Sequence, residues 1–172
     1  MMRHLKAKDF RVMPWANGRG HTVEMWREDR DGTLLWRLSR AAVVEDGPFS
    51  IFPGFDRNLT VITGPGFDLV GDVRMSARLL QPVEFAGDVP VRAEGVLAPC
   101  QDFNVMVRRG AVQAQVSVRD GGVTGGTCAL FALGTVRVAG IVLSAQELML
   151  TDEDLVFEGQ AILVNIVPAT FL

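Results

Sequence analysis

The sequence predicts an all-β fold with little helix. Short segments in which every second residue is apolar recur along the chain, and Gly, Pro, Asp and Asn separate them. The stretch that ends at Gly64 also resembles the stretch that ends at Gly134, 70 residues later. These observations predict two similar β-units within a single body of residues 1–172. We place the units at about 1–118 and 119–172 and allow strands to be exchanged between them.

Each expected strand is bounded by turn-forming residues. In chain order, the expected strands are 21–27, 34–44, 58–63, 67–70, 102–108, 112–118, 128–133, 135–138 and 161–167. Gly64-Pro65-Gly66 predicts a turn, and Asp120-Gly121-Gly122 predicts a turn that makes 112–118 a hairpin arm. Segment 144–150 is open between two structures, because Ser144 and Glu147 have capping-box spacing while 148–151 has strand composition.

Composition and charge argue against several classes of partner. The 17 basic and 20 acidic residues give a net charge of −3, and no segment gathers the basic density that nucleic-acid binding needs. The first ten residues carry scattered charges without an apolar segment, and no apolar run approaches the roughly 20 residues that span a bilayer. We therefore expect a cytoplasmic protein with neither nucleic acid nor membrane as a partner.

The sequence contains few candidate metal ligands and no recognisable motif for a catalytic nucleophile. The two histidines and two cysteines are not spaced as metal ligands, so we expect neither a metal nor another cofactor. Cys100 and Cys128 are expected as buried thiols. No serine lies in a Gly-x-Ser-x-Gly motif. The loop Asn17-Gly18-Arg19-Gly20 is expected to be a turn of special backbone geometry rather than a phosphate cradle.

Polar side chains share one face of several expected strands. The pairs concerned are Thr22 and Glu24, Arg37 and Ser39, and Asp102 and Asn104. Such faces either meet water or line the lumen of a barrel. Arginine suits a carboxylate because its planar fork donates two parallel hydrogen bonds, so Arg37 and Arg57 would select an anion if both faced a pocket. Asp56 beside Arg57 is either a local ion-pair partner or part of a ligand site.

Four motifs occur together in the first two-thirds of the chain. They are PWANGRGHTVE (14–24), WRLSRA (36–41), DGPFSIFPGFDR (46–57) and DFNVM (102–106). In this order they resemble the HutD/Ves family. The resemblance implies a double cupin without the metal-binding cupin histidines. It also implies one of two roles: the sensing or restraint of bacterial histidine utilisation through an intermediate such as formylglutamate or urocanate, or a Ves-type role in environmental stress. Arg19 departs from the small residue that is common at its position.

The leading hypothesis is a metal-free cupin that binds a small carboxylate metabolite and regulates or senses histidine utilisation. The predicted ligand-binding residues are Asn17, Thr22, Glu24, Trp36, Arg37, Ser39, Phe52, Arg57, Asp102 and Asn104. Arg37 and Arg57 would hold the anion, and Trp36 or Phe52 would form an apolar wall. Two alternatives are an enzyme that uses Glu24 or Asp102 as general base, and a Ves-type protein that acts through partner proteins. A homodimer is compatible with all three.

Overall fold

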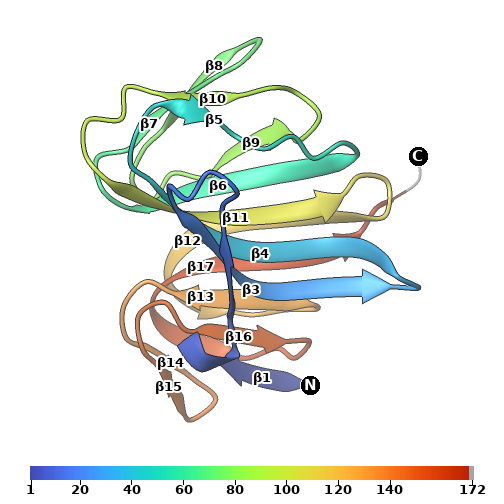
Figure 1. The fold of residues 1–172 in the computed structure, drawn as a ribbon. Helices are drawn as coiled ribbons and strands as arrows, with labels where there is room; N and C mark the ends of the chain where they lie inside the picture. The colour runs from blue at the N-terminus through green and yellow to red at the C-terminus, as the bar shows by residue number, and fades with distance from the viewer. Residues whose placement is uncertain (171–172) are drawn as a thin grey trace. The chain divides into compact units, whose positions relative to one another are not determined.

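The structure is a computed structural model that describes residues 1–170, and its regular structure is almost entirely β-strand (Figure 1). Over that range, the helical structure consists of the single-turn 3-10 helix η1 (Ala7–Asp9), and no helix has the length and apolar character needed to cross a membrane. The prediction of an all-β fold with little helix is confirmed. The chain divides into two compact units, Arg11–Ala111 and a second one that joins Met1–Phe10 to the chain from Val112 onward.

The Arg11–Ala111 unit contains two antiparallel sheets, and the structure describes all of its residues. Its strands are β2 (Arg11–Pro14), β3 (His21–Arg30), β4 (Thr33–Val43), β5 (Gly47–Pro48), β6 (Phe55–Thr63), β7 (Phe67–Val70), β8 (Arg74–Ala77), β9 (Val83–Ala86), β10 (Arg92–Glu94) and β11 (Cys100–Arg108). The large sheet has the order β2-β3-β4-β11-β6-β9, and the small sheet has the order β5-β10-β7-β8. Figure 1 shows β4, β11 and β6 side by side in the large sheet.

One face of the large sheet changes character along its length. Its apolar part packs with the small sheet into a core that contains Val43, Leu59, Val61, Phe67, Leu69, Ala77, Val91, Ala93 and Cys100. Met106 lies opposite Arg37 on β4 and opposite Arg57 on β6. Directly paired residues share a face of the sheet, so this register places both guanidinium groups on the same side.

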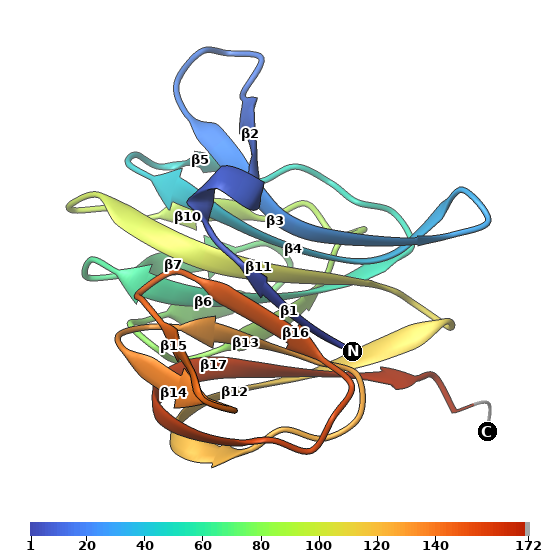
Figure 2. The same ribbon diagram turned by 90° about the horizontal axis from the view of Figure 1, so that it is seen from below.

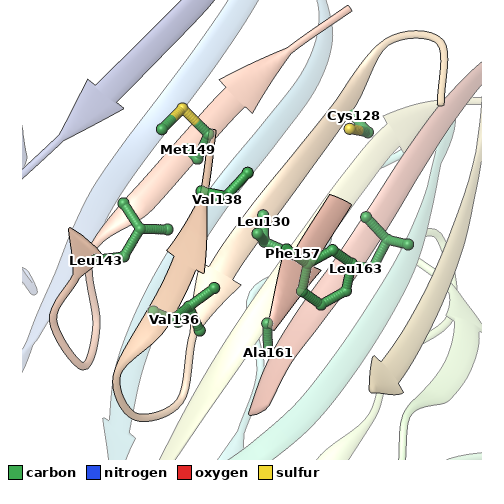
Figure 3. Close-up of a cluster of buried hydrophobic side chains, with 10 residues drawn as sticks. Cys128, Leu130, Val136, Val138, Leu143, Met149, Phe157, Ala161 and Leu163 are labelled. Carbon is green, nitrogen blue, oxygen red and sulfur yellow. The ribbon is translucent and has the colours of Figure 1, made fainter. Parts of the chain in front are cut away.

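The second unit is built around one antiparallel sheet. Its strands are β1 (Met2–Leu5), β12 (Val112–Val123), β13 (Cys128–Ala132), β14 (Val136–Val138), β15 (Ile141–Leu143), β16 (Leu148–Thr151) and β17 (Val156–Pro168). The sheet order is β1-β16-β13-β17-β14-β15, and β12 also pairs with β17. Figure 3 shows the buried apolar cluster of this unit, with the ring of Phe157 among its side chains. The N-terminal strand therefore belongs to the C-terminal sheet.

The weak internal repeat in the sequence corresponds to a shared local structure. β6 is followed by the hairpin of β7 and β8. In the same way, β13 is followed by the hairpin of β14 and β15, which Figure 2 shows. Gly71 and Gly140 lie between the strands of the two hairpins. The similar residues thus occupy similar places in a strand followed by a hairpin.

The predicted turn at Asp120-Gly121-Gly122 is wrong. β12 continues through these residues to Val123 and pairs with β17, and the register between the two strands shifts between Asp120 and Gly122. Gly121 has a φ of 107°. Glycine at positive φ serves β-bulges as well as turns, so the local sequence does not distinguish the two. The strand 112–118 is consequently not the arm of a hairpin closed at this point.

Segment 144–150, for which the sequence is compatible with either a helix or a strand, forms a turn that leads into a strand. The Ser144 backbone N–H donates a hydrogen bond to Glu147 Oε2 at 3.0 Å, and the Glu147 N–H donates to the Ser144 carbonyl at 3.1 Å. These bonds close one turn, and Gln146 has a φ of 68°, outside the helical region. The chain then enters β16. The two hydrogen bonds between Ser144 and Glu147 therefore stabilise a turn here, and no helix begins at Ser144.

Gly159 in β17 is a sensitive position of the second unit. Its φ is 107°, and an added Cβ would lie 2.3 Å from the Thr135 carbonyl oxygen. We expect Gly159→Ala to lower the free energy of unfolding by about 2 kcal/mol, measured by urea denaturation. Gly126→Ala is the matched control, because Gly126 also has a positive φ, of 60°, with open space around the added Cβ. An equal loss in both variants would show that the contact with Thr135 contributes nothing.

Candidate functional site

A cavity of about 600 Å³ lies within the Arg11–Ala111 unit. Its walls come from one face of β4, β6 and β11, from the loop between β2 and β3, and from residues 44–50. This volume falls in the range of small-molecule sites in proteins. The site is therefore large enough for a metabolite and is formed inside one unit.

Arg57 is the most enclosed cation of the cavity, with 7% of its surface exposed. Its Nη1 donates a hydrogen bond to the Ser50 carbonyl at 3.1 Å, and its Nη2 donates to Asn104 Oδ1 at 3.2 Å. Burial lowers the pKa of Arg57 to about 10, so it is still charged at neutral pH. Three rings surround the guanidinium carbon, those of Phe49, Phe52 and Phe85 at 5.7, 5.2 and 5.0 Å from their centroids.

Asp102 is a fully buried carboxyl group on the cavity wall. Its Oδ1 accepts a hydrogen bond from Asn104 Nδ2, and its Oδ2 has no partner of hydrogen-bond geometry within residues 1–170. Burial raises the pKa of Asp102 to about 7, although the charge of Arg57 and hydrogen bonds from Asn104 and the Ala41 backbone oppose the rise. Asp102 can therefore exchange a proton near neutral pH.

Arg37 and Glu24 form a second charged group beside the first. Arg37 Nε lies 2.7 Å from Glu24 Oε2, and both side chains are largely buried. Within the described residues, this ion pair is the polar contact that Arg37 makes, which leaves its Nη groups available. The charge of Arg37 also contributes to the lowered pKa of Arg57. Two cations that repel each other across one cavity favour an anion between them.

The structure brings most of the predicted ligand-binding residues together. Eight of the ten line the cavity: Asn17, Thr22, Arg37, Ser39, Phe52, Arg57, Asp102 and Asn104. Glu24 contributes through its ion pair with Arg37. Trp36 is not an apolar wall of the cavity, since strand alternation turns it to the opposite face of β4, where its ring lies 6.4 Å from that of Trp26.

The loop between β2 and β3 is a turn with special backbone geometry, as predicted. Gly18 has a φ of 70°, and Asn17 Oδ1 accepts a hydrogen bond from the Arg19 backbone N–H at 2.9 Å. An added Cβ at Gly20 would lie 2.7 Å from the Trp15 ring, so a larger residue at this position would displace that ring. Arg19 is exposed at the cavity wall and pairs with Glu45 at 2.8 Å.

Several residues of the cavity were not among the predicted ligand-binding residues. They include Trp15, Phe49, Ser50, Met106 and the loop residues 44–48. Trp15 Nε1 donates a hydrogen bond to Thr22 Oγ1 at 3.0 Å. The motif DGPFSIFPGFDR signals the importance of this loop, but a loop has no periodicity that reveals which side chains point inward. Asp56 pairs with Arg109 at 2.7 Å, whereas the hydrogen bonds of Arg57 go to Ser50 and Asn104.

A divalent cation does not fit this cavity. The guanidinium groups of Arg37 and Arg57 face it and would repel a metal ion. Among residues 1–170, no group of three or more His, Cys, Asp or Glu side chains is placed to hold a metal. Cys100 and Cys128 are free, buried thiols, as expected.

The fold and the site define a cupin-fold protein with a guanidinium-lined cavity. A cupin 2 conserved barrel domain protein from Leptotrichia buccalis shares the fold at a TM-score of 0.53 and 8% identity, over 86% of this chain and 88% of that one. The family model HutD matches residues 7–169. The chain therefore belongs to the HutD family, and the resemblance seen in the sequence motifs is confirmed.

Three relatives place the chain within that family. HutD from Pseudomonas fluorescens SBW25 superposes with a TM-score of 0.89 and 30% identity, over 99% of this chain and 100% of that one. An uncharacterized 21.2 kDa protein in the hutC 3′ region of Pseudomonas putida is 36% identical over 121 residues, which cover 68% of this chain and 64% of that relative. Protein Ves of Cronobacter sakazakii is 36% identical over 122 residues, covering 69% and 67%.

Proposed function

We propose that this protein binds a small carboxylate metabolite in the cavity of the Arg11–Ala111 unit and acts as a cytoplasmic sensor or regulator of histidine utilisation. The observation that carries the proposal is the pair of guanidinium groups, Arg37 and Arg57, that line one cavity, with Arg57 buried in its wall. A ligand of the formylglutamate or urocanate type fits this chemistry, because it joins a carboxylate to a further polar group.

The roles of the two arginines differ. Both Nη groups of Arg57 already donate hydrogen bonds within the protein, so Arg57 supplies positive charge from a fixed position. The Nη groups of Arg37 are available for a direct, two-bond contact with a carboxylate. Ser39 and Thr22 add hydroxyl groups on the cavity wall, and Phe52 adds an apolar surface. Together these groups supply an anion site with an apolar and hydrogen-bonding surround.

The link to histidine utilisation is supported by family membership. The chain belongs to the HutD family, and one relative comes from the hutC 3′ region of Pseudomonas putida. Wild-type protein should therefore bind at least one of urocanate, N-formylglutamate, histidine or glutamate in preference to succinate. Isothermal titration calorimetry with each compound measures this preference.

Arg37→Gln tests the site itself. We expect this change to weaken carboxylate binding by roughly 10- to 100-fold, because a hydrogen bond to a charged group contributes about 1.5–3 kcal/mol. Arg74→Gln is the matched control: Arg74 is also paired with acidic residues, Asp68 and Glu94, but it is exposed and outside the cavity. Failure of wild-type protein to bind any of the carboxylates, or unchanged affinity in Arg37→Gln, would contradict the proposal.

A further inference from the structure

We propose that carboxylate binding in this cavity is coupled to the uptake of one proton by Asp102, through Asn104 and Arg57. The inference rests on the proposed function and adds a regulation to the same site. It predicts a protein that binds its ligand more tightly as the pH falls from about 9 to 7.

A continuous series of side chains connects Asp102 to the positive charge of the cavity. Asn104 donates a hydrogen bond to Asp102 through Nδ2 and accepts one from Arg57 through Oδ1. Asn104 is 6% exposed, Arg57 is 7% exposed and Asp102 is fully buried, so little of this series is in contact with water. Because Asn104 separates the two charged groups, the carboxylate and the guanidinium interact without forming a direct ion pair. The positive charge of Arg57 thus attracts both ionised Asp102 and any anion that enters the cavity.

The charges that face Asp102 determine its response to a ligand. Arg57 faces it from β6, while Arg37 on β4 is paired with Glu24 on β3. The inner site therefore carries one net positive charge when Asp102 is protonated and none when Asp102 is ionised. Three more charged side chains line the outer part of the cavity. Arg19 is paired with Glu45, and Asp46 accepts a hydrogen bond from the Val96 backbone N–H.

Among the described residues, those paired with Asp102 across the sheet carry no charge. Its cross-strand partners are Ala41 on β4 and Val61 on β6, and the small sheet contributes Ala93 to the cavity wall. These apolar groups leave the ionised carboxylate with Asn104 and the Ala41 backbone as its hydrogen-bonding support. A second negative charge in the same cavity would therefore repel the ionised carboxylate of Asp102.

A carboxylate ligand therefore competes with ionised Asp102 for the same positive charge. Bringing the ligand into the buried site raises the pKa of Asp102 further, since a like charge nearby disfavours ionisation. In the free protein this pKa is about 7. Above that pH, binding must be accompanied by proton uptake, and the dissociation constant rises by up to about tenfold per pH unit.

The test is a calorimetric titration of N-formylglutamate into the full chain between pH 6 and 9. Its carboxyl groups have ordinary pKa values of about 4 and stay ionised over this range. We expect a nearly constant dissociation constant up to about pH 6.5 and a rise of up to about tenfold per unit above pH 7. At pH 8.5, the binding heat should also depend on the ionisation enthalpy of the buffer, because a proton is taken up.

Asp102→Asn represents the protonated state and supplies the decisive comparison. We expect this variant to bind with little dependence on pH, and at pH 8.5 to bind roughly tenfold or more tightly than the wild type. His21→Gln is the control, because His21 is the histidine of the Arg11–Ala111 unit; it should keep the wild-type dependence, since His21 is exposed at the start of β3 and is not part of the cavity wall.

The outcomes separate this inference from the proposed function. Wild-type binding that is independent of pH and of buffer would overturn the coupling and leave the anion site intact. Weaker binding by Asp102→Asn at every pH would also overturn it, because Asp102 would then be a direct ligand partner. Absence of binding to any carboxylate over the whole pH range would remove the proposed function, and the coupling with it. The buffer dependence is measured on wild-type protein and needs no variant.

Discussion

Phe157→Ala is expected to lower the free energy of unfolding by about 3–5 kcal/mol. Phe157 is 1% exposed and belongs to the buried cluster of the second unit, together with Leu130, Val136 and Leu163 (Figure 3). Removing the ring takes apolar surface out of the core and leaves a cavity that neighbouring strands fill only in part. Urea denaturation followed by far-UV circular dichroism measures the loss.

The neighbouring residue offers a matched control. Val156 lies on the same strand but is 68% exposed, so Val156→Ala should change the free energy of unfolding by less than about 0.5 kcal/mol. A loss below about 1 kcal/mol in Phe157→Ala would show that the cluster is loosely packed or that it collapses freely around the vacancy.

Asp102→Asn is expected to stabilise the protein at pH 8 by about 3–4 kcal/mol and to have almost no effect near pH 4. The pKa of Asp102 is about 7 in the folded protein, because the carboxyl group is buried, against an ordinary value of 3.8 for this side chain in water. Between these values the folded state holds a proton that the unfolded state has released. The free energy of unfolding of the wild type therefore decreases as the pH rises through this range, by up to about 1.4 kcal/mol per unit.

The measurement is the difference between the unfolding curves of the variant and the wild type at several pH values from 4 to 8. Asp88→Asn is a control of the opposite sign. Arg109 and the Gly54 backbone N–H lower the pKa of Asp88 to about 2, so its ionised form stabilises the fold above the unfolded pKa. Asp88→Asn should thus destabilise the protein at pH 8. An Asp102→Asn effect that does not vary with pH would show that Asp102 does not titrate in this range.

The strands and the polar cavity face were predictable because they depend on a local property. Alternation with period two sets Arg37 and Ser39 on one side of β4 and Asp102 and Asn104 on one side of β11, and the observed cavity uses those sides. The same alternation places Trp36 on the other face of β4, so the prediction that Trp36 forms a cavity wall did not agree with the alternation that correctly placed Arg37 and Ser39. Short strands such as β8 (Arg74–Ala77) and β10 (Arg92–Glu94) escaped prediction because a few residues display too little of the pattern.

Pairings between distant residues could not be read from the sequence. β1 joins β16 across more than 140 residues, and β12 pairs with β17 instead of turning back at Gly121. Asp56 forms an ion pair with Arg109, 53 residues away in the sequence, and not with its neighbour Arg57. In each case the local signal is compatible with a second arrangement, and the choice between them is made by contacts that exist only after the sheets have formed.

The β-class, most of the strands, the side of each central strand that carries polar groups, and the family could all be predicted from the amino-acid sequence. The meeting of Arg37, Arg57, Asn104 and Asp102 at one cavity depends on the register of β4, β11 and β6, which is set by the tertiary structure. The tertiary structure also decided the proton affinity of Asp102. Burial sets that affinity, and a residue acquires its burial from the whole fold and not from its neighbours in the chain.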